Sequence, residues 1–195
     1  MTAISKTDMD ILFNSARTFT AWKNEPVSDE ILMRIYDLAK MAPTAANCQP
    51  MRIVYVKSRE AKELLKPCLD KGNVDKVMSA PATAIIAGDA EFYNHFDKLF
   101  PFADVKSWYV GKQPLIDETL ARNTALQGAY FILAARALGL DCGPMSGFDN
   151  KKADDAFFKG TPYKSNFLCN IGYGDASKLY PRAPRFDFKE ACKIA

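Results

Sequence analysis

A single histidine, His95, occurs in this chain of 195 residues, and that count limits the chemistry that its side chains could perform. A metal site with several histidine ligands is impossible. A serine hydrolase would need His95 as its base, yet the sequence contains no Gly-x-Ser-x-Gly nucleophile turn. If the chain is an enzyme, we expect a bound cofactor to carry the chemistry, and we expect His95 to be a surface or half-buried aromatic residue.

Three separated segments contain residue types that could contribute to such a site. They are Arg17-Thr-Phe-Thr20, the proline-bracketed polar loop of residues 43–50, and the glycine-rich segment of residues 143–148. Each is weak alone, because an arginine is usually solvated and loops of these compositions are usually simple turns. The pair Gly172-x-Gly174 does not make a dinucleotide-binding fingerprint, since the third glycine is missing.

The elements that must position these segments are a mixture of helices and strands. Ser28 is a good N-cap for a helix that Pro43 would end. The strongest helix spans residues 118–138 with a wide apolar stripe, and Gly139 is its natural stop. Because helices and strands do not alternate cleanly, the pattern favours an α+β fold over a doubly wound sheet. We also expect helices over residues 8–20 and 59–69 and strands over residues 53–56, 83–87 and 167–172. Residues 92–116 show no clear period, so we expect them to form an irregular segment, the excursion, that covers a binding site. A turn is expected over residues 143–147.

The composition is that of an ordinary globular domain, with 48% apolar and 25% charged residues, and the length suits one domain over residues 1–195. The net charge of +3 is small and the basic residues are scattered, which argues against a nucleic-acid partner. We expect neither a signal peptide nor a membrane span, since the longest apolar run covers only residues 129–135. The five widely spaced cysteines, without a CxxC pair, indicate free thiols in a reducing cytoplasm and no metal site.

Four sequence segments, taken together and in this order along the chain, resemble a known family, although no single segment is specific enough to do so alone. They are Arg17-Thr-Phe-Thr with Glu25-Pro-Val, then Ala42-Pro-Thr-Ala-Ala-Asn-Cys-Gln-Pro50, then Ala137–Phe148, and finally Ile171-Gly-Tyr-Gly174 with Arg182 and Arg185. Together they resemble the FMN-dependent nitroreductase family over nearly the whole chain. The resemblance implies a nitroreductase-like fold, with a central, mainly antiparallel sheet flanked by helices, in an interlocked homodimer that binds FMN.

The resemblance implies that the FMN phosphate is held by Arg17, Arg182 and Arg185, with hydroxyl donors from Thr18 and Thr20. A guanidinium gives bidentate, charge-assisted hydrogen bonds to phosphate oxygens. The family's second arginine is Thr20 here, so the phosphate would be held more lightly unless Arg185 compensates.

The residues that the resemblance places around the flavin ring come from three segments. The resemblance implies that a loop of the partner subunit lines the ring. The side-chain amides of this loop match the hydrogen-bond donors and acceptors along the edge of the ring. A cation near the pyrimidine end would stabilise negative charge on the reduced ring, and backbone amides of Ser146 and Gly147 could bond its N5 atom. The set comprises Pro43, Thr44, Asn47 and Gln49 of the loop, then Asn73 and Lys76, then Pro144, Met145, Ser146 and Gly147.

The second half of the chain resembles one branch of that family more narrowly. The segments concerned are residues 154–158, 164–166 and 170–180. This branch reduces malonic semialdehyde (3-oxopropanoate) to 3-hydroxypropanoate in pyrimidine catabolism, with NADPH or NADH as co-substrate. Ser146 stands where the family often has an acidic residue, and the lost negative charge would favour an anionic substrate.

The resemblance assigns no catalytic side chain, because FMN itself would carry the hydride through its N5 atom in a ping-pong reaction. The proton donor to the substrate oxygen stays open among water, the flavin ribityl hydroxyl and a tyrosine of residues 92–116. Two other functions also stay open. One is a broad nitro- or quinone reductase, and the other is a non-catalytic flavin-binding protein.

Overall fold

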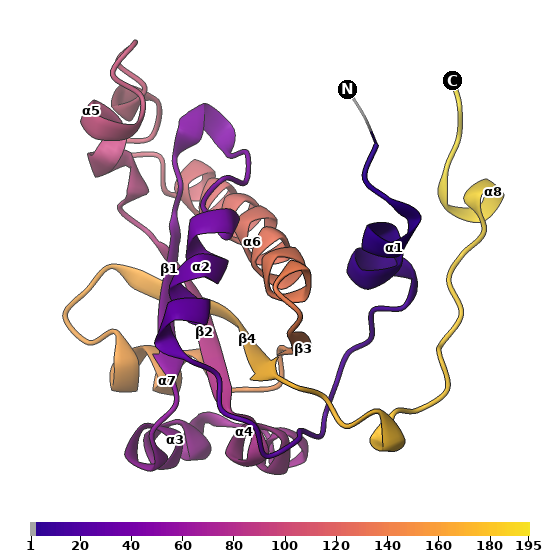
Figure 1. Cartoon of the computed structure of the whole chain (residues 1–195). Helices are drawn as coiled ribbons and strands as arrows, with labels where there is room; N and C mark the ends of the chain where they lie inside the picture. The colour runs from indigo at the N-terminus through magenta and orange to yellow at the C-terminus, as the bar shows by residue number, and fades with distance from the viewer. Residues whose placement is uncertain (1–2) are drawn as a thin grey trace.

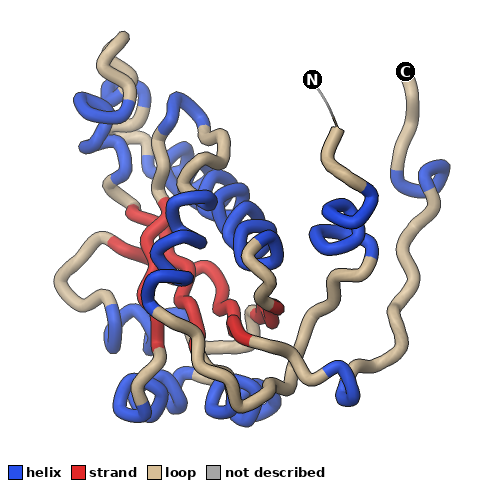
Figure 2. The backbone as a smooth tube through the Cα atoms, in the orientation of Figure 1, coloured by secondary structure: helices blue, strands red, loops and turns tan. Residues whose placement is uncertain are grey.

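Four antiparallel strands form the centre of the molecule. The computed structural model describes residues 3–195. The strands are β1 (Met51–Val56), β2 (Ala82–Asp89), β3 (Asp141–Met145) and β4 (Tyr163–Gly172), and they pair in the order β1-β2-β4-β3. Figure 2 shows this sheet between helices. The α+β prediction is confirmed, and so are the three expected strands, each of which is longer than expected.

β2 is the most deeply buried strand of the sheet. All eight of its residues are buried, and it pairs with β1 along one edge and with β4 along the other. Its sequence is almost continuously apolar, as a strand covered on both faces requires. Successive side chains point to opposite faces, so Ile86 enters one core cluster and Ile85 enters the other.

Helices cover both faces of the sheet. α2 (Asp29–Ala39) and α6 (Gln113–Ala137) pack on the face of Ile86. α3 (Arg59–Leu65), α4 (Val74–Ser79) and α7 (Asn150–Phe157) contribute to the core on the face of Ile85. Figure 1 shows the two groups on different sides of the strands. Among residues 3–195, no helix combines the length and the apolar character that crossing a membrane requires.

α2 begins as the sequence predicts, and α6 ends at its predicted stop but begins at Gln113, five residues before the predicted start at residue 118. The Ser28 hydroxyl accepts a hydrogen bond from the Ile31 amide at the start of α2, which ends before Pro43. Gly139 follows α6 with a φ of +82°, a left-handed conformation that glycine adopts without steric cost. The other helical segments are α1 (Lys6–Met9), α5 (Phe96–Leu99), α8 (Phe188–Ala191), the π-helical turn Asp10–Asn14, and the 3₁₀ segments Ala45–Asn47, Lys66–Cys68, Lys71–Asn73, Phe92–His95, Lys106–Trp108 and Ala176–Lys178.

The helix predicted over residues 8–20 is wrong in its second half. α1 and the π-helical turn end at Asn14, and Thr18 then forms a β-bridge with Cys142. Neither helical segment has a buried residue, so no core contact favours a longer helix here.

The turn predicted over residues 143–147 is also wrong in its first half. Gly143 and Pro144 belong to β3 and pair with β4. A proline is tolerated at this place because β3 lies at the edge of the sheet, where its missing N–H costs no ladder hydrogen bond.

The excursion that the sequence predicts over residues 92–116 packs around a small core of its own, but its last four residues, 113–116, belong to α6. The rings of Phe92 and Tyr109 lie edge to face with centroids 4.9 Å apart, and Phe96 stacks on Tyr109. Cys48 and Ile116 complete this cluster. The excursion is therefore fixed against residue 48 of the polar loop and against the start of α6.

Both termini leave the sheet as extended arms. Figure 1 shows the N-terminal arm with α1 and the C-terminal arm with α8 projecting away from the strands in the same direction. The C-terminal arm carries large apolar side chains in the open, with Phe186 80% and Ile194 84% exposed. Such an arm gains little from burial within its own chain.

The five cysteines are free, and all but Cys192 are buried, as predicted. Burial raises the pKa of the Cys48 thiol to about 11. A hydrogen bond with Cys142, together with burial, raises the pKa of Cys169 well above its ordinary value. These two thiols stay protonated at neutral pH and are poor nucleophiles.

Gly128 lets α6 lie close to the sheet, and this contact provides a test of the packing. A Cβ at Gly128 would lie 2.5 Å from Cε1 of Phe167. We predict that Gly128→Ala lowers the free energy of unfolding by about 1–3 kcal/mol through overpacking, although alanine favours a helix by roughly 1 kcal/mol over glycine. Chemical denaturation of the variant and the parent protein measures the difference.

The matched control for Gly128→Ala is the same substitution made in a Phe167→Leu background, where the shorter side chain leaves room for the methyl group. The loss of stability should be smaller there than in the parent protein. Equal losses in the two backgrounds would contradict the Phe167 contact as the cause.

Candidate functional site

The first cluster of predicted site residues lies where the two terminal arms meet. Arg17 donates to the carbonyl oxygen of Tyr180, 163 residues away in the chain. Arg182 donates to the carbonyl oxygens of Asn14 and Ala16 at 2.8 and 2.9 Å. Within residues 3–195, neither guanidinium is paired with a carboxylate. Two cations are thus held at neighbouring positions without a counter-charge, which suits an anionic group such as a phosphate.

The other residues predicted for the phosphate are held less closely. Thr18 is exposed beside Arg17, and Thr20 is half-buried. Arg185 donates to the carbonyls of Ala183 and Pro184, both at 3.0 Å, and has no contact with Arg17 among the hydrogen bonds of residues 3–195. The structure therefore brings Arg17 and Arg182 together and leaves Arg185 apart.

A backbone contact joins the first predicted segment to the third. The Phe19 amide donates to the Cys142 carbonyl at 3.0 Å. A Cβ at Gly143 would lie 2.4 Å from the Phe19 carbonyl oxygen, so only glycine permits this approach. The contact fixes the segment with Arg17 along the outer edge of β3.

The second cluster consists of Asn73, Lys76 and Gly147, which the sequence predicts around one ring. The Asn73 amide donates to the Gly147 carbonyl at 2.9 Å, and the Lys76 ammonium donates to Oδ1 of Asn73 at 2.9 Å. A Cβ at Gly147 would lie 2.5 Å from Nδ2 of Asn73 and 2.8 Å from Oδ2 of Asp70. Pro144 and Met145 lead into this cluster as the last residues of β3, and both are half-buried.

Asp70 corrects the expectation that this region lacks negative charge. Ser146 is neutral and exposed, as the sequence implies. The carboxylate of Asp70, however, lies against Gly147, and the Asp70 amide donates to the Gly147 carbonyl at 3.1 Å. The cluster therefore contains one cation, Lys76, and one anion, because a neighbouring segment supplies the charge that Ser146 lacks.

Asn170 positions the second cluster, and sequence reasoning missed it. Its side chain is fully buried in β4. Its Nδ2 donates to the Lys76 carbonyl at 2.9 Å, and its Oδ1 accepts from the Thr83 hydroxyl at 2.6 Å. A polar residue inside the apolar run Leu168-Cys-Asn-Ile171 was the signal, since a buried amide needs partners.

The third cluster is the polar loop between α2 and β1, and its backbone is strained. Ala46, Asn47 and Gln49 have φ angles of 46°, 53° and 38°. Non-glycine residues rarely adopt this left-handed conformation, and each instance costs of order 1–3 kcal/mol. Such strain persists only when the surroundings determine the backbone, so the loop is held in one shape.

Two buried side chains of α6 supply that restraint, and sequence reasoning missed both. Oδ1 of Asn123 accepts from the Ala45 amide at 2.8 Å, and Oε1 of Gln127 accepts from the Met51 amide at 2.9 Å. Both side chains are almost completely buried. Polar residues on the buried side of a core helix were the available signal, since a buried amide needs partners.

The predicted flavin-lining side chains of the loop are linked to one another and to the excursion. Nε2 of Gln49 donates to Oδ1 of Asn47 at 2.7 Å, and Nδ2 of Asn47 donates to the Leu99 carbonyl at 2.8 Å. The Thr44 hydroxyl accepts from the Gln49 amide at 3.2 Å, and Pro43 is exposed just before it. Loop and excursion thus form one unit.

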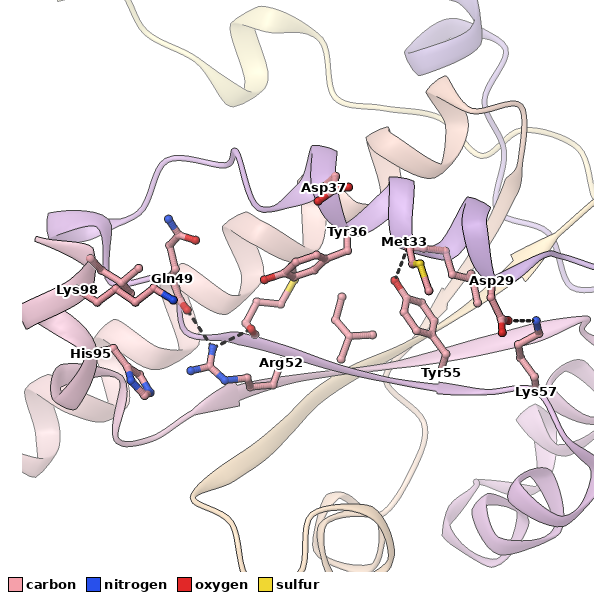
Figure 3. A pocket seen from close by; sticks show the side chains of 14 residues that line it. Asp29, Met33, Tyr36, Asp37, Gln49, Arg52, Tyr55, Lys57, His95 and Lys98 are labelled. Atoms are coloured by element: carbon pink, nitrogen blue, oxygen red, sulfur yellow. Dashed lines mark hydrogen bonds and ion pairs between the residues drawn. The ribbon is translucent and has the colours of Figure 1, made fainter.

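A groove of about 1100 Å³ opens beside this loop, between α2 and β1. Figure 3 shows polar and charged side chains at the Gln49 end, among them Arg52, His95 and Lys98. The rest of the wall is mostly apolar and is lined by Leu32, Met33, Tyr36, Met51, Ile53 and Tyr55. Its shape and lining are those of a small-molecule site, mainly apolar with a few convergent polar groups.

The second and third clusters lie at opposite ends of the sheet. Asn170 ties the second cluster to Thr83, near the start of β2, and the Asp89 amide ties the end of β2 to Pro50, which closes the loop. Along a strand, these six steps span about 20 Å at roughly 3.3 Å per residue. The two clusters of one chain therefore cannot surround the same ring.

Residues 14–173 match a family model described as the nitroreductase family. The chain belongs to the nitroreductase family. It is 56% identical over 194 residues to a protein of Burkholderia lata that is provisionally named NADH dehydrogenase/NAD(P)H nitroreductase, and the match covers 100% of both chains. A protein of Polynucleobacter asymbioticus with the same provisional name is 58% identical over 191 residues, which cover 98% of this chain and 97% of that protein.

Solved structures of nitroreductase-family proteins confirm the nitroreductase-like fold. A Bacillus subtilis protein provisionally named nitroreductase superposes with a TM-score of 0.88 at 23% identity, over 98% of this chain and 100% of that one. A similarly named protein of Exiguobacterium sibiricum, solved in complex with FMN, has a TM-score of 0.87 at 21% identity, with 100% of both chains covered. At these identities the likeness establishes the fold alone.

In this nitroreductase-family chain, Gly147 provides a test of the second cluster. A methyl group at Gly147 would collide with Asn73 and Asp70. We predict that Gly147→Ala lowers the free energy of unfolding by about 1–3 kcal/mol, because both neighbours must move. Thermal or chemical unfolding measures the loss.

Gly72→Ala is the matched control for Gly147→Ala. A Cβ at Gly72 would meet nothing within 4 Å, and the position lies in the same part of the fold. It should leave stability within about 0.5 kcal/mol of the parent protein. Comparable losses for the two variants would show that crowding at Gly147 is not the cause.

Proposed function

We propose that this chain is a homodimeric FMN-dependent NAD(P)H oxidoreductase that reduces malonic semialdehyde to 3-hydroxypropanoate. The observation that carries the cofactor assignment is the pair of arginines at the base of the arms. Arg17 and Arg182 bond neutral carbonyl oxygens and so keep their positive charges available. The FMN of the Exiguobacterium sibiricum protein and the NAD(P)H in the names of the two curated relatives are consistent with it.

The residues present fit the parts of FMN. Arg17 and Arg182, with Thr18, would hold the phosphate. Lys76 would stabilise negative charge at the pyrimidine end of the ring, and the cradle around Gly147, which a Cβ would fill, would let the backbone approach the ring. When bound, FMN supplies hydride transfer from a nicotinamide to the substrate.

The distance between the clusters supports the proposed dimer. Since the loop with Asn47 and Gln49 lies at the far end of the sheet from Gly147, the loop would line the ring held by the partner subunit. The apolar side chains that the C-terminal arm exposes are a suitable surface for an interlocked partner. The cytoplasmic location predicted from the cysteines is part of the same proposal.

The substrate assignment is supported by charge and by the narrower resemblance of the second half of the chain. Lys76 and the basic end of the groove provide cations for the carboxylate of malonic semialdehyde. Asp70 weighs against it, because it restores a negative charge beside Gly147. A broad nitro- or quinone reductase is therefore a second candidate, favoured by the names of both curated relatives. A flavin-binding protein without turnover is the third.

Visible absorption spectroscopy distinguishes the three functions. We expect the protein, after incubation with FMN and desalting, to show a flavin spectrum that NADPH or NADH bleaches without oxygen and that malonic semialdehyde then restores. Recovery with a nitroaromatic or a quinone alone would support the second candidate. A flavin that neither nicotinamide bleaches would support the third, and a protein that retains no flavin would refute the proposal as a whole.

Mixed dimers test whether two chains share each site. Arg17→Ala should weaken FMN binding by about 1.5–3 kcal/mol, the contribution of one charge-assisted hydrogen bond. Asn47→Ala should impair the loop from the other chain. When the two variants are unfolded, mixed and refolded, each heterodimer should have one intact site and one damaged site. The intact site combines Arg17 of the Asn47→Ala chain with Asn47 of the Arg17→Ala chain.

The control for the mixed dimers is each variant refolded alone, which should recover nothing. If loop and arginine belonged to one site of one chain, every site of the heterodimer would carry a mutation. Mixing would then restore neither FMN retention nor turnover, and the shared site would be wrong.

A further inference from the structure

Asp89 is a buried carboxylate that is hydrogen-bonded to Arg52 of β1 and to two residues of the turn that follows β2. Its side chain is only 3% exposed. Its Oδ1 accepts from the Glu91 amide at 2.9 Å, and its Oδ2 accepts from the Arg52 guanidinium at 2.7 Å. Nε2 of His95 lies 2.9 Å from the same Oδ2. The charge of Asp89 is thus balanced and its position is fixed, so it can hold the His95 ring in one orientation.

The contact with Asp89 determines which nitrogen of His95 is available for chemistry. An ionised carboxylate only accepts hydrogen bonds, so Nε2 of His95 must carry a proton. Nδ1 is then the nitrogen that is free to exchange a proton with a substrate in the groove. An imidazole oriented by a carboxylate through its other nitrogen is the arrangement found in general acid and base catalysis.

The His95 side chain is 46% exposed and lines the groove at its Gln49 end. Figure 3 shows it on the same side of the groove as Arg52 and Lys98. The groups with charge or a titratable proton around it are Asp89 of β2, Arg52 of β1, Lys98 of α5, and Tyr36 and Asp37 of α2 across the groove. The hydrogen bond from Asn47 to Leu99 fixes this segment to the loop that is predicted to line the flavin.

We propose that His95 is the catalytic acid that protonates the substrate oxygen, with Asp89 as its positioning residue. The proposal rests on the proposed function, and His95 would serve the ring that its own loop lines. As hydride reaches the carbonyl carbon, the electron pair of the C=O π bond moves to oxygen. That oxygen takes the proton from Nδ1, so an N–H bond breaks and an O–H bond forms.

Regeneration of the acid completes the balance of the reaction. The step converts aldehyde, hydride and one proton to the alcohol, and it leaves His95 neutral. Because the ring is partly exposed, the proton returns from solvent between turnovers. The sequence leaves a tyrosine of residues 92–116 open as one of three donors. Tyr109 is buried in the excursion core and Tyr93 packs against Phe92, so we assign the role to His95 instead.

The test separates proton transfer from electron transfer in FMN-loaded, NADPH-reduced protein. His95→Gln should slow reoxidation by malonic semialdehyde by about 10²- to 10⁴-fold, the usual contribution of a general acid. Reoxidation by ferricyanide, which takes electrons without a proton, should be unchanged, and so should bleaching by NADPH. The pH dependence that the parent rate with the aldehyde shows should be lost in the variant.

The matched control is Asn94→Ala, an exposed residue of the same turn that does not line the groove. It should match the parent protein with every acceptor. The proposal is overturned if His95→Gln keeps the parent rate and pH profile with the aldehyde, or if it slows ferricyanide equally. Failure of NADPH to bleach the parent protein would instead refute the proposed function, and the acid role with it.

A readout besides activity uses the fact that His95 is the sole histidine. Its imidazole proton signals in an NMR spectrum of the FMN-loaded protein need no further assignment. Malonate, which has the same carbon chain as the substrate and cannot be reduced at its second carboxylate, should shift these signals. Signals that stay unmoved at malonate concentrations that inhibit the reaction would place the substrate away from His95 and overturn the proposal.

Discussion

The burial of β2 on both faces and along both edges is the constraint on which the rest of the structure depends. Since every residue of this strand is buried, its backbone must pair with β1 and β4, and its two faces must be covered by separate groups of helices. The consequence for the site is direct. The start of β2 is tied through Asn170 to the cluster around Lys76, and its end carries Asp89, which is bonded to Arg52 and His95. One apolar strand thus fixes the spacing between the two groups of polar residues.

Buried polar side chains hold the surface segments of the site against this core by hydrogen bonds to their backbone. Asn123 and Gln127 extend from α6 to the backbone of the polar loop and of Met51, which follows it, and Asn170 extends from β4 to the Lys76 carbonyl of α4. Each satisfies a backbone group that would be costly to leave without a partner. The segments that are predicted to contact a cofactor are therefore irregular in backbone conformation but rigidly held. This rigidity suits a site in which the cofactor, rather than a mobile side chain, carries the hydride.

Patterns that depend on burial were readable from the sequence, whereas contacts between distant segments were not. The apolar run of β2, the stripe of α6 and the stop at Gly139 follow from periodicity and from glycine's conformational freedom. The end of the first helix and the start of β3 were missed because the bridge between Thr18 and Cys142 joins residues far apart in the chain. For the same reason, motif order grouped Asn73, Lys76 and Gly147, yet it gave no indication of Asp70 beside them or of Asp89 behind His95. The roles of the predicted residues stay predictions.

The strained loop has a consequence for how the sequence can change over time. Its three left-handed residues are Ala46, Asn47 and Gln49, and one of the contacts that keep them in place is an acceptor on another element, Asn123. A substitution at Asn123 would remove that restraint while leaving most of the core intact, and the loop would be freer to relax toward ordinary backbone angles. The chain would still fold, but its loop would have a different shape. A mutation at this core position, which touches no ligand, would thus impair function. We expect sequence variation at Asn123 to be as restricted as variation in the loop itself.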